Sequence, residues 1–487
     1  MAVSKVILNN TTLIDATTAT ATAADITSPK TAMLADGVMT TGTGSGGGGS
    51  DDSKNVLFID YDGEELYQYT TEELRAMNAL PANPSHAGLT AQGWNWSLAD
   101  AKAYVTAYPE ADLVIGQNYV TSDGKTRIYI YVDDLTDVST PFYLRFTATD
   151  DGGVKIDWGD NSSAEYSTGT DAATYSHIYS SVGEYVVTLE AETGSYSFTT
   201  YINGPTSTDT WISRRRIRKV EIGSNVSVGT YTFSYCVCLQ TVTIPTTAGL
   251  SGNYIFQDCR NLLAAVVPTG VTSMGNSVFI YCNSINYVSF PNGLVTVGSS
   301  FFNNKCGIKR VTIPNSVTTI GGSFLQYAYR LKNLTIPSSL TTVTSSTDSA
   351  YFAQYSSVEK VEIFSGADLK RYAFAYTNLK TAIIHTGVTA ITTSEFSGCY
   401  GLEKVIIASS VTSIGQYAFQ SCATISEFHL QGTTPPTLYD AAAINASNLA
   451  GCIYFVPYSA DHSVLATYKN DTNWSTFADR IFEEPQS

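Results

Sequence analysis

The chain has 487 residues, which is long enough for several domains. Its apolar fraction of 43% is typical of a globular protein, and its net charge of −16 argues against non-specific binding of nucleic acid. No run of 18 apolar residues occurs, so the sequence predicts no membrane insertion. The charge is uneven, because residues 1–210 carry 28 acidic and 9 basic residues while residues 211–487 carry 15 and 18.

The N-terminal region consists of a polar segment at 1–43 and a flexible Gly/Ser linker at 44–53. The phrase TAADITSPKTAMLADGVMTTGT at 22–43 resembles a short module at the start of many bacteriophage tail and minor structural proteins. This resemblance implies an attachment segment that joins the chain to other virion proteins. The N-terminus MAVSKVILNNTTLID has no apolar run long enough for a secretory signal, which favours a virion protein assembled in the host cytoplasm.

Residues 54–137 predict a small mixed α+β domain. Its phrases FIDYDG, LPANP and GLTAQGWNWSL resemble a domain of predicted phage minor structural proteins, to which no enzymatic activity is attached. We expect a helix that opens on a Thr-x-x-Glu cap. The predicted elements are strands at 55–63, 112–120 and 126–134 and a helix at 70–80.

An enzyme is the alternative interpretation of this domain. The motif IDYDG at 59–63 looks like the nucleophile motif of haloacid-dehalogenase phosphatases, whose aspartates also hold magnesium, and VDD at 132–134 imitates their late acidic pair. The two motifs are close together in the sequence and no lysine motif lies between them. A strand that ends in a turn explains the same residues, so we predict no catalytic site and no cofactor.

Residues 138–205 contain IDWGDNSS at 156–163 and HIYSSVGEYVVTL at 177–189, which resemble the PKD family. The resemblance implies an immunoglobulin-like β-sandwich, in which Asp160 and His177 hold a turn and its facing strand together. Aspartates near Asp160 could also hold calcium, but turn chemistry explains them equally well, and we predict no metal. The residues of the structural motif are Trp158, Asp160, His177, Tyr179, Gly183 and Tyr185.

A 23-residue period runs through residues 211–487. Apolar or small residues lie three and five positions after each anchor, which predicts a short strand, and proline follows that strand in five consecutive units. One unit cannot bury its own apolar face, but stacked units share a continuous core. The anchors are Ile217, Leu239, Leu262, Ile285, Ile308, Leu331, Val358, Leu379, Leu402 and Ile425.

These units, such as VTIPNSVTTIG at 311–321, resemble the BspA-like leucine-rich repeats. The resemblance implies a right-handed solenoid with a parallel sheet on one face. From the period we predict a continuous sheet of about nine or ten strands between residues 220 and 430. A last strand and a helix with Tyr468, Trp474 and Phe477 are expected to cap the C-terminal end.

Six of the eight cysteines occupy one repeat position. A ladder with one cysteine per coil is typical of a small buried apolar residue, so we predict buried, reduced thiols. Disulfides between neighbouring coils and metal ligation are the alternatives. The six are Cys236, Cys259, Cys282, Cys306, Cys399 and Cys422.

Two sets of side chains are candidates for binding. Residues two positions after each anchor point away from the core, and in this row Tyr287, Arg310, Lys360 and Lys404 combine an aromatic ring with cations. We predict that this row binds a host cell-surface glycan or protein. The second set consists of tyrosines that either stack on a ligand or pack against the next coil, namely Tyr231, Tyr235, Tyr254, Tyr281, Tyr372, Tyr376 and Tyr417.

The run RRRIRK at 214–219 is a third feature of the surface, and it predicts either a basic patch or a solvated first strand.

Together these observations predict a mainly β, multidomain chain with a small α+β domain, an Ig-like sandwich and a leucine-rich-repeat solenoid. The predicted function is that of a non-enzymatic bacteriophage virion protein, a tail or head fibre, which binds the host cell surface through its repeat array. We expect a homo-oligomer, with a trimer as one possibility. The alternatives are a bacterial cell-surface adhesin and a capsid decoration protein without receptor-specific binding.

Overall fold

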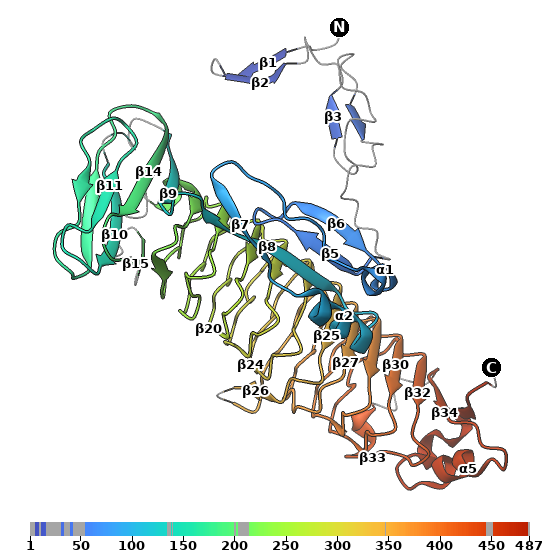
Figure 1. The fold of residues 1–487 in the computed structure, drawn as a ribbon. Coiled ribbons are helices and arrows are strands. Elements are labelled where there is room, and N and C mark those ends of the chain that lie inside the picture. The colour runs from blue at the N-terminus through green and yellow to red at the C-terminus, as the bar shows by residue number, and fades with distance from the viewer. Residues whose placement is uncertain are drawn as a thin grey trace.

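The computed structural model describes residues 54–133, 138, 140–198, 201–202, 214–345, 347–444 and 451–485, and four strands near the N-terminus (Figure 1). These strands form two antiparallel pairs, β1–β2 and β3–β4. They are β1 (Lys5–Leu8), β2 (Thr11–Asp15), β3 (Thr31–Met33) and β4 (Met39–Thr41). The rest of segment 1–43 and the linker 44–53 lie outside the described residues, so the attachment role stays a prediction.

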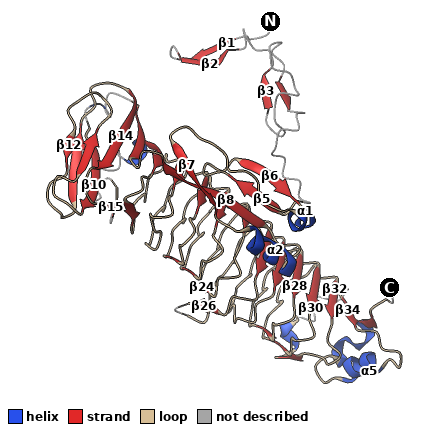
Figure 2. Ribbon diagram, in the orientation of Figure 1, coloured by secondary structure: helices blue, strands red, loops and turns tan. Residues whose placement is uncertain are grey.

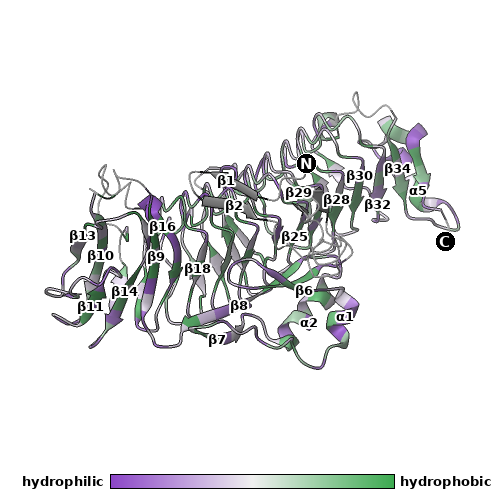
Figure 3. Cartoon of the chain, turned by 90° about the horizontal axis from the view of Figure 1, so that it is seen from above, coloured by the Kyte–Doolittle hydropathy of each residue, from purple (hydrophilic) through white to green (hydrophobic). Residues whose placement is uncertain are grey.

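The small domain is a four-stranded sheet with two helices on one face. Its strand order is β6-β5-β8-β7, and β5 and β8 are parallel. Phe58 packs with Leu74 of α1 and Tyr104 of α2, and both helices carry apolar as well as polar residues (Figure 3). The elements are β5 (Val56–Ile59), β6 (Glu65–Tyr69), α1 (Thr71–Ala76), β7 (Leu89–Trp94), α2 (Leu98–Ala107) and β8 (Leu113–Thr121). The predicted cap of α1 is confirmed, because Thr70 and Glu73 form a capping box.

The next unit is a β-sandwich of two antiparallel sheets, ordered β13-β10-β15 and β12-β11-β14-β9. Its strands are β9 (Thr126–Val132), β10 (Phe142–Ala148), β11 (Val154–Asp157), β12 (Glu165–Tyr166), β13 (Ala173–His177), β14 (Gly183–Ala191) and β15 (Tyr196–Phe198). The sequence pattern assigns β9 to the small domain, but the strand pairs with β14 of the sandwich along its whole length. Its alternating buried and half-buried residues are typical of a sandwich strand.

Both sheets of the sandwich continue into the solenoid. Strand β9 pairs antiparallel with β16 (Ile217–Glu221), and β15 pairs parallel with β17 (Val226–Val228). One hydrophobic core therefore runs without a break from Ile128 in the sandwich to Ile481 at the C-terminal end. The sandwich therefore caps the first coil.

The solenoid has two ladders of parallel strands (Figure 2). The first contains β16, β18 (Thr241–Thr243), β19 (Ala264–Val266), β21 (Tyr287–Ser289), β23 (Arg310–Val311), β25 (Asn333–Ile336), β27 (Lys360–Ile363), β28 (Thr381–Ile384), β30 (Lys404–Ile407) and β32 (Glu427–Leu430). The second contains β17, β20 (Ser273–Met274), β22 (Thr296–Val297), β24 (Thr319–Gly321), β26 (Thr342–Thr344), β29 (Ala390–Ile391), β31 (Ser413–Ile414) and β33 (Thr437–Leu438).

The number of strands in the first ladder agrees with the prediction, but its continuity does not. Strand pairing is interrupted between β18 and β19 and again between β23 and β25. Both interruptions lie among the five coils in which proline follows the strand, but proline alone does not cause them, because β19, β21 and β23 are also followed by proline and pair with one another.

The repeat positions are buried as the period predicts. All ten anchors are at most 3% exposed, and the repeat phenylalanines form stacks, with ring centroids 5.3 Å apart from Phe233 to Phe256 and from Phe256 to Phe279. Each of the five prolines accepts a hydrogen bond at its carbonyl from the residue three positions on, as Pro245 does from Ala248 at 3.0 Å. Proline therefore ends the strand and opens the turn toward the second ladder.

The cysteine ladder is buried and reduced, which confirms that prediction. All eight cysteines are free, and the six ladder thiols are 0% exposed. The sulfhydryls also donate to the backbone, since Cys259 Sγ lies 3.0 Å from the carbonyl oxygen of Phe233 and Cys422 Sγ lies 3.1 Å from that of Phe396. Burial raises the pKa of Cys236 to about 12, so this thiol is protonated at neutral pH.

Thiol titration of the native protein is expected to modify Cys238 alone, because it is half-buried while the other seven cysteines are buried. After denaturation all eight should react. Cys238→Ser should abolish the native reaction and leave seven thiols in the denatured chain. Rapid reaction of several thiols in the native Cys238→Ser variant would contradict a closed core.

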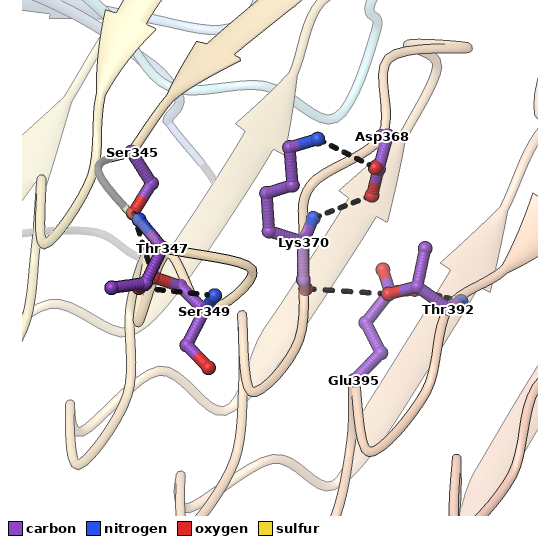
Figure 4. Close-up of polar contacts among 7 residues, drawn as sticks. All are labelled: Ser345, Thr347, Ser349, Asp368, Lys370, Thr392 and Glu395. Atoms are coloured by element: carbon purple, nitrogen blue, oxygen red, sulfur yellow. Dashed lines mark hydrogen bonds and ion pairs between the residues drawn. The ribbon is translucent and has the colours of Figure 1, made fainter.

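The coil between Leu331 and Val358 has a loop after β26 that local hydrogen bonds hold. Ser345 Oγ donates to the carbonyl of Ser349 at 2.8 Å, and Thr347 Oγ1 donates to the same oxygen at 3.0 Å (Figure 4). Beside it, the carboxylate of Glu395 accepts hydrogen bonds from the backbone N–H of Thr392 at 2.7 Å and from its hydroxyl at 3.0 Å.

Replacing Glu395 by glutamine is expected to alter the pH dependence of stability. Burial raises the pKa of Glu395 from 4.5 to about 7, although hydrogen bonds from Thr392 oppose this shift. Between these two pH values the folded protein holds a proton that the unfolded chain has released, so stability falls as pH rises, by about 3 kcal/mol. Glu395→Gln should remove this fall, which thermal unfolding between pH 4 and 8 would measure. Parallel profiles for both proteins would contradict the assignment.

Three aromatic residues cap the C-terminal end as predicted, but only Tyr468 lies on an α-helix, and Trp474 and Phe477 belong to a separate 3₁₀ segment. Tyr468, Trp474 and Phe477 are at most 1% exposed, and the indole of Trp474 donates to the carbonyl of Pro436 at 2.8 Å. The cap consists of the 3₁₀ helix η2 (Ala441–Ala443), β34 (Ile453–Val456), α5 (Ser463–Asn470), the 3₁₀ helix η3 (Ser475–Arg480) and β35 (Ile481–Glu483). No helix in the described part of the chain is long and apolar enough to cross a membrane.

Candidate functional surface

The small domain lies on the outer face of the first ladder, over the coils nearest the sandwich, and the C-terminal coils extend beyond it (Figure 1). Leu57, Ile59 and Val114 of the small domain pack with Val266 and Tyr287 of the solenoid. No local sequence pattern predicts this contact, because its two sides are more than a hundred residues apart in the chain.

The small domain donates hydrogen bonds to backbone carbonyls of the solenoid that receive none from the next coil. Where the following coil has no proline, its backbone N–H at that position donates to the last carbonyl of the strand before it. His385 N–H donates in this way to the carbonyl of Ile363 at 2.9 Å. Pro268 and Pro291 cannot do so, and the carbonyl oxygens of Ile244 and Val267 would be left without that donor.

Side chains of the small domain supply the missing donors. Asn118 Nδ2 lies 3.3 Å from the carbonyl oxygen of Ile244, and Asn95 Nδ2 lies 3.1 Å from that of Val267. Trp96 Nε1 donates in the same way to the carbonyl of Phe290 at 2.7 Å. Sequence reasoning missed these residues, although the row of prolines signalled that one carbonyl per coil needs a donor from elsewhere.

The predicted binding row is divided by this contact. Tyr287 is 3% exposed and donates to the carboxylate of Glu65, and Arg310 donates to the carbonyl of Lys54 at 2.8 Å. Burial and the carboxylate of Glu65 raise the pKa of Tyr287 above its usual value. The expectation that these two side chains lie open to a ligand is wrong, because the small domain covers them.

The other two residues of the row lie at and beyond the edge of the small domain. Lys360 is half-buried between Glu110 at 3.7 Å and Glu362 at 2.8 Å, whereas Lys404 is 41% exposed and pairs with Glu427 at 3.4 Å. Bulky residues occupy the second outward position there: Ile383, Ile406, His429 and Phe455 are register partners. Under the small domain the same position carries Thr243, Val266, Ser289, Thr312 and Thr335.

The basic run at 214–219 is neither a patch nor a solvated strand. Arg214 and Arg216 are 0% exposed at the junction between the sandwich and the first coil. Arg216 donates to the carbonyl of Thr140 at 3.0 Å, and the guanidinium of Arg214 lies over the ring of Tyr201. Both expectations for residues 214–219 are therefore wrong, because the sandwich, including its strand β9, covers Arg214 and Arg216.

The phosphatase-like motif forms a turn. Asp60 is buried, and its carboxylate accepts hydrogen bonds from the backbone N–H of Tyr61 at 2.8 Å and pairs with His86 Nε2 at 2.6 Å. Asp62 accepts from the N–H of Glu64 at 3.0 Å, as an Asx turn requires. Among the described residues, no group of three His, Cys, Asp or Glu side chains could hold a metal ion.

The sandwich motif has the predicted geometry. His177 Nε2 lies 2.7 Å from Asp160 Oδ2, which joins the turn to β13, and the indole of Trp158 stacks on His177 at 5.2 Å. Burial raises the pKa of Asp160, but bonds from Ser162 and His177 outweigh it and lower the pKa to about 2. The hydroxyl of Tyr179 donates to the carbonyl of Trp158 at 2.9 Å. The motif is structural, and the resemblance to PKD domains stays a prediction.

Gly183 and Tyr185 complete this motif at the start of β14. Gly183 is the first residue of the strand, and the ring of Tyr185 packs on that of Tyr179 with centroids 4.2 Å apart. Tyr185 donates to the carbonyl of Ser181 at 2.9 Å, which fixes the turn before the strand.

Tyrosines occupy left-handed positions on the turns of the solenoid. Tyr327, Tyr355 and Tyr376 have φ values of 62°, 58° and 60° and are 41%, 45% and 39% exposed. Sequence analysis singled out Tyr376 but missed the other two, because their coils have Leu325 and Ala353 in place of the repeat phenylalanine. These rings pack against the next coil, as one of the two interpretations of the tyrosines predicts, while stacking on a ligand stays a prediction.

Comparisons with known proteins identify the repeat. The family described as BspA type Leucine rich repeat region matches residues 210–332 and 322–449. No curated protein matches the chain.

Three solved structures of bacterial repeat proteins are similar to the chain. A leucine-rich repeat protein from Bacteroides ovatus is 21% identical over 50% of this chain and 74% of its own, with a TM-score of 0.32. A leucine rich cell surface protein from Faecalibacterium prausnitzii is 18% identical over 67% and 98%, with a TM-score of 0.33. A leucine-rich repeat protein from Eubacterium ventriosum is 17% identical over 51% and 83%, with a TM-score of 0.23. From their period, their buried anchors and the family match, residues 210–449 form a BspA type leucine-rich repeat region.

Proposed function

We propose that this chain is a non-enzymatic attachment protein that binds an extracellular surface through the part of its repeat array that the small domain leaves open. The observation that carries this proposal is the division of the solenoid surface. The small domain covers the outer face near the sandwich, while the strands from β28 onward and the tyrosine turns stay accessible. An extended array makes many weak contacts, and several copies acting together would add avidity.

The open strands offer a surface of mixed chemistry. Lys404 is 41% exposed, Ile453 is 37% exposed and Phe482 is 48% exposed. Bulky apolar side chains at outward positions are unusual where they serve no packing, and together with a cation they suit a glycan or protein ligand. Lys360 and Lys404 therefore remain proposed ligand-binding residues, whereas Tyr287 and Arg310 serve the internal contact.

An attachment protein must be displayed outside the cell, and we propose the bacterial cell surface as the location to test first. A bacteriophage tail or head fibre is the second candidate, favoured by the phage-like phrase at 22–43. In a fibre, deleting residues 1–43 should leave the other domains folded but absent from purified particles. Normal incorporation of the deleted chain would remove the virion candidate.

The proposed function can be tested by sedimentation of the labelled full chain with intact bacterial and animal cells. The double variant Lys404→Gln/Phe482→Ser should bind at least fivefold less than the wild type with little change in its unfolding temperature, because it introduces no like-charge pair with Glu427 and both side chains are close to half exposed. Tyr166→Asn is a matched control, since Tyr166 is 45% exposed on β12 at the far end of the sandwich. Binding to no cell type, or equal loss in the control, would overturn the proposal.

A further inference from the structure

Three tyrosines on consecutive coils form a stack on the solenoid surface, which we call the tyrosine ladder: Tyr327, Tyr355 and Tyr376. The ring centroids of Tyr327 and Tyr355 are 5.1 Å apart with an interplanar angle of 6°, and those of Tyr355 and Tyr376 are 5.1 Å apart at 8°. Each ring is 39–45% exposed. The ladder thus repeats one exposed aromatic group at the spacing of the coils.

The left-handed backbone makes tyrosine an unfavourable choice at these positions. Bulky residues rarely adopt a positive φ, and other coils place Asn304, Gly398 and Ser421 at the equivalent turn. Mutual stacking of the rings offsets part of that cost. Packing alone does not require the hydroxyls, because the stack would be the same with phenylalanine.

The neighbours of the ladder are polar and uncharged on its inner side. Asn303 Nδ2 donates to Gln326 Oε1 at 3.3 Å, and Gln326 Nε2 donates to Gln354 Oε1 at 2.9 Å, so an amide row runs beside the rings. Gln354 is only 7% exposed, so these amides chiefly brace the turns. A ligand would therefore meet the phenol hydroxyls and the ring edges.

Tyr400 adds an open ring at one end of the ladder. It is 62% exposed, and its ring is tilted by 47° to that of Tyr376 with centroids 6.4 Å apart. Gly398 makes this geometry possible, because a Cβ there would lie 2.5 Å from the ring of Tyr376. Tyr400 therefore presents a ring face, whereas the inner rings present hydroxyls and edges.

We propose that the tyrosine ladder and Tyr400 form a binding site for a neutral polysaccharide. Such a polymer repeats a hydroxyl-bearing unit of about the length that separates the rings, so successive sugars can hydrogen-bond to successive phenols. The C–H face of one sugar can stack on Tyr400, as aromatic side chains with a polar tip allow. None of the four side chains is charged, which favours a neutral polymer over an acidic one. This inference rests on the proposed attachment function and names its ligand.

Native electrophoresis of the full chain in gels that contain hydroxyethyl cellulose, dextran or polygalacturonate tests the proposal. The wild type should be retarded by at least one of the two neutral polymers and not by polygalacturonate. Replacing all three ladder residues by asparagine should weaken that retardation at least tenfold, since Asn304 shows that asparagine fits this turn. Tyr→Phe at the same three positions keeps the stack and should weaken it at least threefold through the lost hydroxyls.

Tyr281→Asn is the matched control, because Tyr281 has the same backbone conformation, with φ 63°, and is 42% exposed outside the ladder. It should bind as the wild type does. No retardation by either neutral polymer, or equal retardation of the wild type and the triple asparagine variant, would overturn the polysaccharide site. If the wild type binds cells and the triple asparagine variant does not, while neither neutral polymer retards the wild type, the attachment function is kept and the ligand of the ladder is a protein. Retardation by polygalacturonate alone would also overturn the inference.

Discussion

Replacing Asn95 by leucine is expected to destabilise the contact between the small domain and the solenoid by about 3 kcal/mol. Asn95 is 1% exposed and donates to the carbonyls of Val267 and Ser289, both at 3.1 Å. Its Oδ1 accepts from the N–H of Gly116 at 2.9 Å. Leucine has a similar size but no polar atoms, so each of these buried groups would lose a partner.

Denaturant unfolding followed by tryptophan fluorescence measures this effect, because Trp94 and Trp96 lie in the same segment. Gln92→Leu is the control. Gln92 accepts from the N–H of Thr246 at 2.9 Å at a partly exposed position, where water can replace the lost bond, so the expected change is below about 1 kcal/mol. Equal shifts in the two variants would mean that the buried carbonyls do not depend on Asn95.

Replacing Ile128 by asparagine in β9 is expected to cost about 4 kcal/mol or more and to loosen the sandwich from the solenoid. Ile128 is 0% exposed and lies between two strands, opposite Val187 of β14 and Val220 of β16. The change removes apolar contacts from both partners and leaves an amide without hydrogen bonds in the core. Loss of the cap would expose the apolar end of the first coil.

Hydrogen exchange at β9, β16 and β18 would locate this effect, and thermal unfolding would give its size. Tyr131→Ser in the same strand is the control, because Tyr131 is half-buried and lies on the opposite face of the strand. The guanidinium of Arg218 lies over its ring, 5.8 Å from the centroid. Its expected cost is about 1 kcal/mol. If Ile128→Asn left exchange at β16 unchanged, the sandwich and the solenoid would fold independently.

The sequence predicted the interior of the solenoid more fully than its surface. Leu239 and Cys259 could be placed because a strict period leaves one set of positions facing inward, and every coil repeats the same evidence. Asp160 and His177 could be paired because their motif is local. β9 was assigned to the wrong unit, since its pattern of alternating residues fits any half-buried strand and does not specify the partner.

The exposure of the candidate binding residues could not be predicted from the repeat pattern. Tyr287 and Lys404 hold the same repeat position, so their sequence context is alike, yet one is 3% exposed and the other 41%. The difference comes from the small domain, whose Leu57, Ile59 and Val114 pack with Tyr287 and do not reach Lys404. Contacts between segments so far apart depend on how whole domains pack, which no local pattern encodes.

By itself the sequence determined the repeat, the burial of its anchors and thiols, and the turns that end each strand, because these follow from side-chain period and from the missing N–H of proline. Only the tertiary structure decided which part of the array stays open. The prolines leave carbonyls without donors, the small domain satisfies them, and the residues beneath it become core. What remains accessible lies on the turns and on the last coils, where each strand is capped by its own neighbour.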